Sequence, residues 1–111
     1  MSNDFLNVFL NEMKTNVNGF IAVAVTEIET GLSFGNITVD SAFDPELAAA
    51  YNLEVVKAKL NAVKALGLNQ DIEDILITLS NQIHIIDISP NKKFMIYLAA
   101  GATKANLGMT R

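Results

Sequence analysis

The chain has 111 residues, a length typical of one domain, so we expect a single domain over residues 1–111. Its formal net charge is −4 and no cluster of Lys or Arg offsets it, which argues against nucleic acid as a partner. Half of the residues are hydrophobic and only 18% are charged, against about 25% in ordinary soluble domains. A small domain has much surface to hydrate, so this composition predicts an apolar surface buried at an interface.

Cysteine is absent, so disulfides and thiolate metal sites are excluded and a reducing compartment is favoured. The opening "MSNDFLNVFLNEMK" has neither a basic start nor a long apolar core, so it does not predict a signal peptide. No apolar run reaches the ~18–20 residues needed to cross a bilayer. We therefore expect a cytoplasmic protein without a membrane partner.

The first predicted element is a helix over residues 3–16, with apolar side chains at helical spacing on one face. Residues 20–29, "FIAVAVTEIE", are rich in β-formers and start apolar on both faces, which predicts a central strand covered on two sides. A turn at Thr30-Gly31 leads to a second strand over residues 32–39, so the two strands should form a hairpin.

A long helix follows. Asp44 suits its N-cap, Pro45 occupies a position where an early helical proline is tolerated, and Glu46 complements the helix dipole. The helix should run to Leu66 and end at Gly67, because glycine commonly terminates helices.

Three more strands are predicted over residues 71–80, 83–89 and 93–100. The segment after them, residues 101–111, has room for two helical turns at most, so we expect a short C-terminal stub. The order α-β-β-α-β-β-β, with hairpins on each side of a long crossover helix, predicts an α+β fold. Its five-stranded, mostly antiparallel sheet should carry helices on its faces.

Most aromatic side chains are predicted to lie in the core. Phenylalanines in the first helix and the strands suit that position, and two near the hairpin and the start of the long helix could instead contact a partner, although the core is favoured. The phenylalanines assigned to the core are Phe5, Phe9, Phe20 and Phe94, and the two with an alternative are Phe34 and Phe43.

The long helix carries two apolar stripes instead of one when its residues are projected at about 100° each. The inner stripe is bulky and consists of Ala49, Leu53, Val56, Leu60 and Val63. The outer stripe lies roughly 150° away. It consists of Leu47, Tyr51, Val55, Ala58, Ala62, Ala65 and Leu66. One stripe must pack on the domain's own sheet, and the other needs a partner unless its alanines are simply helix formers.

We predict that the outer stripes of two copies pack against each other across a two-fold axis. The third strand supports this, because "DILITLS" is apolar on both faces and would invite aggregation at an open sheet edge. Pairing it with its twin would create one continuous sheet, whereas a central position would need no partner. The expected homodimer interface thus adds Ile75, Ile77 and Leu79 to the outer stripe.

The sequence offers little catalytic chemistry. His84 is the only histidine, and Asp87, three residues further along a strand, should point to the opposite face, so a structural role is favoured over a general base. Asp71, Glu73 and Asp74 lack the spacing of a calcium loop, and a solvated loop is favoured. The glycines of "GLSFG" and "GATKANLG" match no nucleotide-binding motif. We predict no catalytic residue, no metal and no cofactor.

The element order, the opening "GFIAVAVTEIETGLSFG" and the ending "KFMIYLAAGATKANLGMTR" resemble the roadblock family of the dynein light-chain type, specifically its bacterial, small-GTPase-associated members. The similarity covers nearly the whole chain, and "ANLG" at residues 105–108 is its most specific part. The resemblance implies a profilin-like or longin-like fold and a homodimer built through the second helix and third strand. It also implies a non-enzymatic regulator or scaffold for a Ras-like small GTPase. Family members commonly continue "ANLG" into a third helix that this chain lacks, which weakens a GTPase-activating role more than the dimer.

Two other functions remain open. A small-molecule-sensing or ligand-binding domain of profilin-like or longin-like fold would need a cavity beneath the first helix. A small hydrolase or isomerase would need an acid–base pair, which the sequence does not offer. If a GTPase is the partner, a polar row between the two stripes is a candidate contact surface, consisting of Glu54, Lys57, Asn61 and Lys64.

Overall fold

The computed structural model describes residues 3–101, which form helices and strands in the predicted order. The elements are α1 (Asn3–Asn16), β1 (Phe20–Glu27), β2 (Ser33–Thr38), α2 (Pro45–Ala65), β3 (Asp74–Thr78), β4 (Gln82–Ile88) and β5 (Phe94–Gly101). The third strand is shorter at both ends than predicted, because residues 71–73 belong to the loop that leaves α2 and residues 79–80 to the turn before β4. The predicted C-terminal stub lies outside the described residues. No helix within residues 3–101 is long and apolar enough to cross a membrane.

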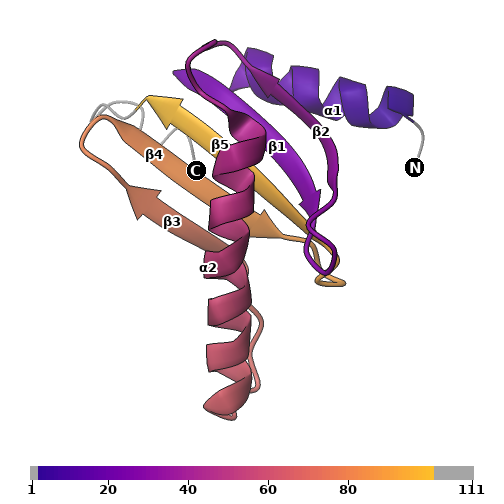
Figure 1. Cartoon of the computed structure of the whole chain (residues 1–111), viewed down its shortest axis with the longest axis vertical. Helices are drawn as coiled ribbons and strands as arrows, with labels where there is room; N and C mark the ends of the chain where they lie inside the picture. The colour runs from indigo at the N-terminus through magenta and orange to yellow at the C-terminus, as the bar shows by residue number, and fades with distance from the viewer. Residues whose placement is uncertain (1–2, 102–111) are drawn as a thin grey trace.

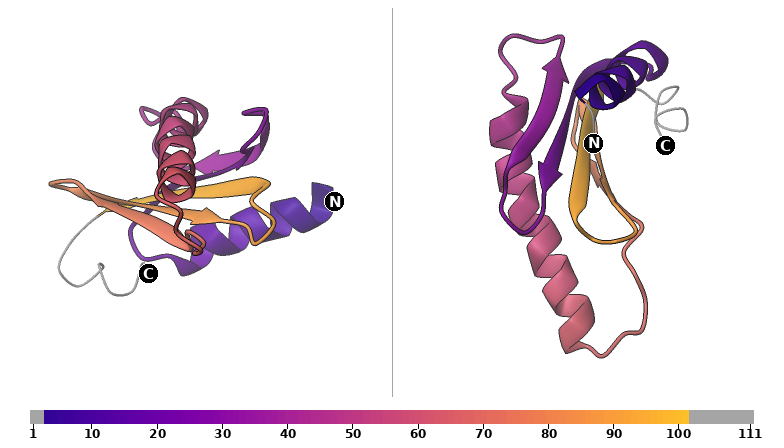
Figure 2. Two further views of the ribbon diagram at one scale, coloured as in Figure 1. Left: turned by 90° about the horizontal axis from the view of Figure 1, so that it is seen from below. Right: turned by 90° about the vertical axis from the view of Figure 1, so that its right-hand side faces the viewer.

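The five strands form one antiparallel sheet in the order β2-β1-β5-β4-β3 (Figure 1). β1 and β5 lie at its centre, and β3 forms one edge. Because β2 and β3 are at opposite edges, α2 must carry the chain across the whole sheet. The two helices lie on opposite faces, as both views in Figure 2 show. The predicted α+β fold is confirmed.

Each face of the sheet has its own core. On the α2 side, Leu53 and Val56 of the helix pack with Ile86, Met95 and Tyr97 of the strands. On the α1 side, the helix contributes its buried leucines to a cluster that also holds side chains from β1 and β5, consisting of Leu6, Leu10, Val23, Val25 and Leu98. β1 is thus buried on both faces, as its sequence predicts.

α1 lies very close to β2, and Gly35 makes this possible. A Cβ atom at this position would stand 3.1 Å from Leu10 Cδ1 and 3.2 Å from Leu6 Cδ2. Such contacts are tighter than ordinary van der Waals packing, so a side chain here would push α1 away from the sheet.

The ends of α2 follow the local sequence. The Asp44 carboxylate accepts hydrogen bonds from the backbone N–H groups of Glu46 and Leu47, both at 3.1 Å, and Pro45 begins the helix. These bonds satisfy amides that have no partner within a helix. Leu66 is the C-cap, and Gly67 follows with φ of 68°, a conformation that glycine adopts without strain.

α2 is longer than the sheet that it crosses, and its C-terminal half extends beyond the strands (Figures 1 and 2). Consequently only the first part of the inner stripe, Ala49, Leu53 and Val56, is buried, whereas Leu60 and Val63 are half-buried. The expectation that one whole stripe packs on the sheet is therefore correct for Ala49, Leu53 and Val56 and in part for Leu60, which packs at the margin of the α2-side core.

Two of the aromatic assignments are wrong. Phe5 is 67% exposed, because it lies beside the apolar face of α1 rather than on it. Phe34 is also exposed, and its ring meets that of Phe94 edge to face with centroids 5.3 Å apart. Phe43 is half-buried against the α2-side core, as predicted. The remaining phenylalanines, Phe9, Phe20 and Phe94, are half-buried at the margin of the α1-side core.

Candidate interaction surface

The outer stripe of α2 lies on the surface, on the side of the helix that faces away from the sheet. Tyr51 is 70% exposed and Leu66 is 72% exposed. Leu47, Val55, Ala58 and Ala65 are exposed as well, and Ala62 is half-buried. A row of apolar side chains along one helix is the kind of patch that marks an interaction site on a small protein.

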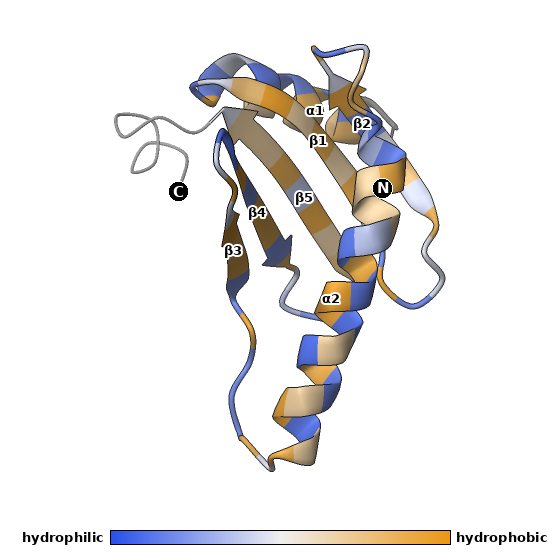
Figure 3. Ribbon diagram, turned by 60° about the vertical axis from the view of Figure 1, so that its left-hand side comes forward, coloured by the Kyte–Doolittle hydropathy of each residue, from blue (hydrophilic) through white to orange (hydrophobic). Residues whose placement is uncertain are grey.

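β3 lies at an edge of the sheet, so the alternative of a central position for this strand is wrong. Ile75 and Ile77 are half-buried and pack against the α2-side core, and Leu79, just beyond the strand, is exposed. Figure 3 shows β3 as an apolar strand at the outer edge. Apart from Asp74 at its start, this edge strand lacks the charged or proline residues that commonly protect such edges. The residues of the predicted interface thus occupy a surface helix and a sheet edge.

The polar row flanks the outer stripe. Glu54, Asn61 and Lys64 are exposed, and Lys57 is half-buried. Apolar and polar residues alternate along α2 in Figure 3, as expected for a helix whose apolar stripes are separated by polar rows. The row therefore borders the surface that the outer stripe would use for self-association.

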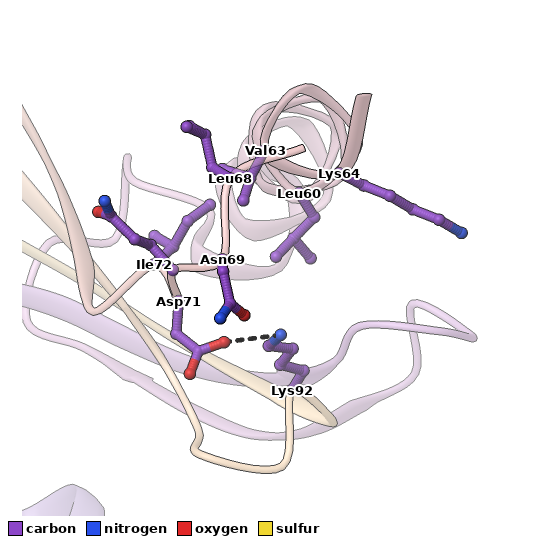
Figure 4. Close-up of a pocket in the computed structure, with 9 residues that line it drawn as sticks. Leu60, Val63, Lys64, Leu68, Asn69, Asp71, Ile72 and Lys92 are labelled. Atoms are coloured by element: carbon purple, nitrogen blue, oxygen red, sulfur yellow. Dashed lines mark ion pairs between the residues drawn. The ribbon is translucent and has the colours of Figure 1, made fainter. Parts of the chain in front are cut away.

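A pocket of about 380 Å³ lies under the projecting end of α2 (Figure 4). Leu60 and Val63 of the helix face the following loop there, and Lys64 extends away from that loop. Lys92 Nζ and Asp71 Oδ1 form an ion pair at 2.8 Å that ties this loop to the turn between β4 and β5. Both side chains are at least half exposed, so the pair positions the loop while adding little stability. Periodicity within the sequence does not predict this pocket, because the pocket depends on the length of α2 relative to the sheet.

His84 is held in a small polar cluster on the α2 side of the sheet. Its Nε2 lies 2.9 Å from Gln82 Oε1, and its Nδ1 lies 3.2 Å from the Tyr97 hydroxyl. A neutral imidazole satisfies both contacts, with Nε2–H donating to Gln82 and the Tyr97 O–H donating to Nδ1. Burial lowers the pKa of His84 and raises the pKa of Tyr97 to about 12. Both groups therefore stay neutral at physiological pH and form a structural cluster.

Asp87 lies on the other face of β4, as its spacing from His84 predicts, so the two do not form an acid–base pair. It lines a hollow of about 230 Å³ beside α1 and pairs across the strands with Asp74. Burial, with a smaller contribution from the charge of Asp74, raises the pKa of Asp87. Among residues 3–101, no group of three or more His, Cys, Asp or Glu side chains is arranged to hold a metal ion.

An apolar hollow of about 320 Å³ lies at the N-terminal end of α1, between the helix and the sheet. Among the described residues that line it, Ser89 alone is polar. Its Oγ donates to Asn91 Oδ1 at 2.7 Å and accepts from the Phe94 N–H at 3.0 Å. The other lining residues are Phe5, Leu6, Phe9, Val25, Phe94 and Ile96. The ligand-binding alternative needs a cavity of this kind beside the first helix. The sequence indicates it only through Phe5, which lies beside the apolar face of α1 and lines the hollow.

No family model matches the sequence, and no curated protein matches it. Solved structures do share the fold. MglB of Myxococcus xanthus is 12% identical with a TM-score of 0.83, and the match covers 100% of this chain and 86% of that one. A Roadblock/LC7 domain of Streptomyces avermitilis is 13% identical with a TM-score of 0.71, covering 85% and 76%. An MglB described with a tetrameric arrangement is 14% identical with a TM-score of 0.75, covering 96% and 77%.

Proposed function

We propose that this chain, which has the roadblock fold, is a non-enzymatic homodimeric scaffold or regulator that binds a Ras-like small GTPase. Residues 1–111 would form one domain of this type. The observation that carries the proposal is the outer stripe of α2. The same helix already buries the first part of its inner stripe against the sheet, and the outer stripe stays exposed to solvent in the part of the chain that the structure describes, residues 3–101.

The energetics favour a stable dimer. If the two copies together bury ~600 Å² of apolar surface, the gross gain is roughly 15 kcal/mol at ~25 cal/mol/Å². Association consumes much of this through lost translational and rotational freedom, by about 4–15 kcal/mol. The small side chains of Ala58, Ala62 and Ala65 would let two helices approach closely, which adds packing contacts. The tetrameric arrangement described for one MglB supports self-association of this fold.

A small GTPase as the second partner is supported by the resemblance of the sequence to bacterial roadblock proteins and by the fold shared with MglB. The polar row Glu54, Lys57, Asn61 and Lys64 is the surface that we assign to this partner, because it lies beside the outer stripe and most of its side chains are exposed in one copy. A cytoplasmic location suits both partners and fits a sequence without cysteine.

Binding to Ras-like GTPases encoded in the same genome tests this function. Each purified GTPase is loaded with GDP or with a non-hydrolysable GTP analogue, and its affinity for the full chain is measured by biolayer interferometry. We expect one GTPase to bind with a preference for one nucleotide state. Lys57→Glu with Lys64→Glu should weaken binding at least about tenfold, whereas Lys14→Glu on α1 should not. The proposal would be contradicted if the unmodified chain and both variants bound the GTPase with equal affinity. It would also be contradicted if no GTPase bound in either nucleotide state.

The apolar hollow at the end of α1 favours a second candidate function, a domain that senses a small apolar molecule. Its volume of about 320 Å³ is in the range of small-ligand sites. This function predicts a monomer, or a dimer that forms only with ligand. Saturable binding of an apolar fluorescent dye to the folded monomer, abolished by Phe9→Asp, would favour it over the scaffold.

A further inference from the structure

The connection between α1 and β1 contains the one Asn-Gly pair of the sequence, Asn18 and Gly19. An asparagine that precedes glycine is prone to lose its amide, because a residue without a side chain leaves its backbone nitrogen free to attack the neighbouring side chain. Both residues are exposed, between the end of the helix and the first residue of the strand. The pair therefore combines a reactive sequence with contact to water.

The fold itself requires the glycine of this pair. Gly19 has φ of 70°, and the Phe20 N–H closes the turn by donating to the Val17 carbonyl. Glycine is favoured at the third position of such a turn, because it has no Cβ atom that would clash at positive φ. The residue that makes Asn18 reactive thus has a structural reason to be there.

The backbone nitrogen of Gly19 is accessible for the attack. Its N–H makes no backbone hydrogen bond within residues 3–101, whereas its carbonyl accepts from the Gly101 N–H at 2.7 Å. The bond that closes the turn is 3.3 Å long, compared with roughly 2.9–3.0 Å for a typical backbone bond. A weak bond in an exposed turn opens at small cost, so the nitrogen can reach the Asn18 side chain while the sheet stays folded.

We propose that Asn18 is a site of spontaneous deamidation in the folded protein. The Gly19 nitrogen attacks Asn18 Cγ, and the side-chain nitrogen leaves as ammonia with the proton of the Gly19 N–H, which closes a succinimide ring. Water then opens the ring. Addition of water at Cγ gives aspartate, and addition at the backbone carbonyl carbon gives isoaspartate, in which the chain runs through Cβ and Cγ. The net change is hydrolysis of an amide to a carboxylate and ammonium, with water as the co-reactant.

Isoaspartate adds one atom to the backbone of a turn that is held on both sides. Val17 packs at the margin of the α1-side core, and the Gly19 carbonyl is bonded to the Gly101 N–H. Several side chains hold Val17, whereas one hydrogen bond holds the carbonyl, so the longer turn should break the bond to Gly101. The proposal is independent of the homodimer, because α1 and the outer stripe of α2 lie on opposite faces of the sheet (Figure 2).

Peptide mapping by mass spectrometry during incubation of the full chain at physiological temperature and pH tests the reaction. Asn69 is the internal control, because it is exposed in a connection too but precedes Gln70, whose side chain hinders the attack. Asn18 should convert from amide to acid at least about tenfold faster than Asn69 in the folded protein. An isoaspartyl methyltransferase with a labelled methyl donor identifies isoaspartate. Equal rates at the two asparagines, or conversion of Asn18 in urea but not in the folded protein, would overturn the proposal.

Amide hydrogen exchange tests the structural consequence. The modified protein carries one more negative charge and can be separated by ion exchange. Its Gly101 amide should exchange at least about fivefold faster than that of fresh protein. Asn18→Gln, incubated in parallel, is the matched control and should keep the original rate, because its longer side chain would have to close a larger ring. An unchanged rate in protein that contains isoaspartate, or an equal increase in the control, would contradict the loss of the Gly19–Gly101 bond.

Discussion

Substituting glutamate for both Tyr51 and Ala62 perturbs the outer stripe without touching the core. The two residues lie on the same stripe, about three helical turns apart. Because the Tyr51 side chain is exposed within one copy, its loss should change the free energy of unfolding of that copy by less than about 0.5 kcal/mol. Two carboxylates in a paired apolar stripe, in contrast, would have to be desolvated for the copies to associate.

The magnitude follows from the exposed area of the tyrosine. Tyr51 is 70% exposed, and a tyrosine side chain presents about 200 Å², so about 140 Å² is available to a partner. At ~25 cal/mol/Å² this amounts to about 3.5 kcal/mol for each copy, before any cost of the introduced charge. Since only a part of buried area is recovered as affinity, we expect at least about 3 kcal/mol, or roughly a 100-fold increase in the dissociation constant.

Sedimentation velocity across a dilution series measures this dissociation constant, and circular dichroism confirms that the fold is kept. The matched control is Asn61→Glu with Lys64→Gln, which changes the net charge by the same amount on the same helix but within the polar row. The control should dimerise like the unmodified protein. Equal dissociation constants for the Tyr51 and Ala62 variant and its control would refute the assignment of the outer stripe to the interface.

Three further predictions concern the fold itself. Gly35→Ala should lower the free energy of unfolding in urea by about 1 kcal/mol, because the added methyl group crowds two leucines of α1; unchanged stability would contradict the close packing of α1 on β2. Asp44→Ala should cost about 1 kcal/mol by leaving two amides of α2 without their cap, whereas Asp44→Asn should retain most of the stability. Asp87→Asn should stabilise the protein at pH 7 by a few tenths of a kcal/mol. Burial and the charge of Asp74 raise the pKa of Asp87, so the ionised carboxylate is disfavoured in the folded state, and the uncharged amide removes this penalty. This gain should vanish in urea titrations below the ordinary aspartate pKa of 3.8, and a gain that is independent of pH would contradict its electrostatic origin.

The local features of the fold could be read from the sequence because they depend on short-range spacing. The cap of α2 at Asp44, its end at Gly67 and the doubly covered β1 each follow from a few neighbouring residues. The two stripes of α2 follow from helical periodicity in the same way. The observed elements confirm the expected α+β order, and the outer stripe lies exposed on α2.

The remaining features depend on long-range packing and could not be read in this way. The half-burial of Leu60 reflects the length of α2 relative to the sheet, which periodicity does not contain. Tyr97 meets His84 only because β4 and β5 pair in one particular register. Residues 71–73 have the sequence pattern of a strand but lie in a loop. Asp71 in this loop forms an ion pair with Lys92, a contact that the local pattern does not contain. Residue type alone places Phe5 in the core, whereas helical spacing places it beside the apolar face of α1, and its side chain is exposed.

The mass of the unmodified chain in solution tests most directly whether a second copy covers the outer stripe. Light scattering from the purified protein should give twice the 12.0 kDa mass of one chain over a wide range of concentration. A mass of 12.0 kDa under the same conditions, with Tyr51 and Ala58 hydrated and no second chain against them, would contradict the proposed dimer and the role built on it.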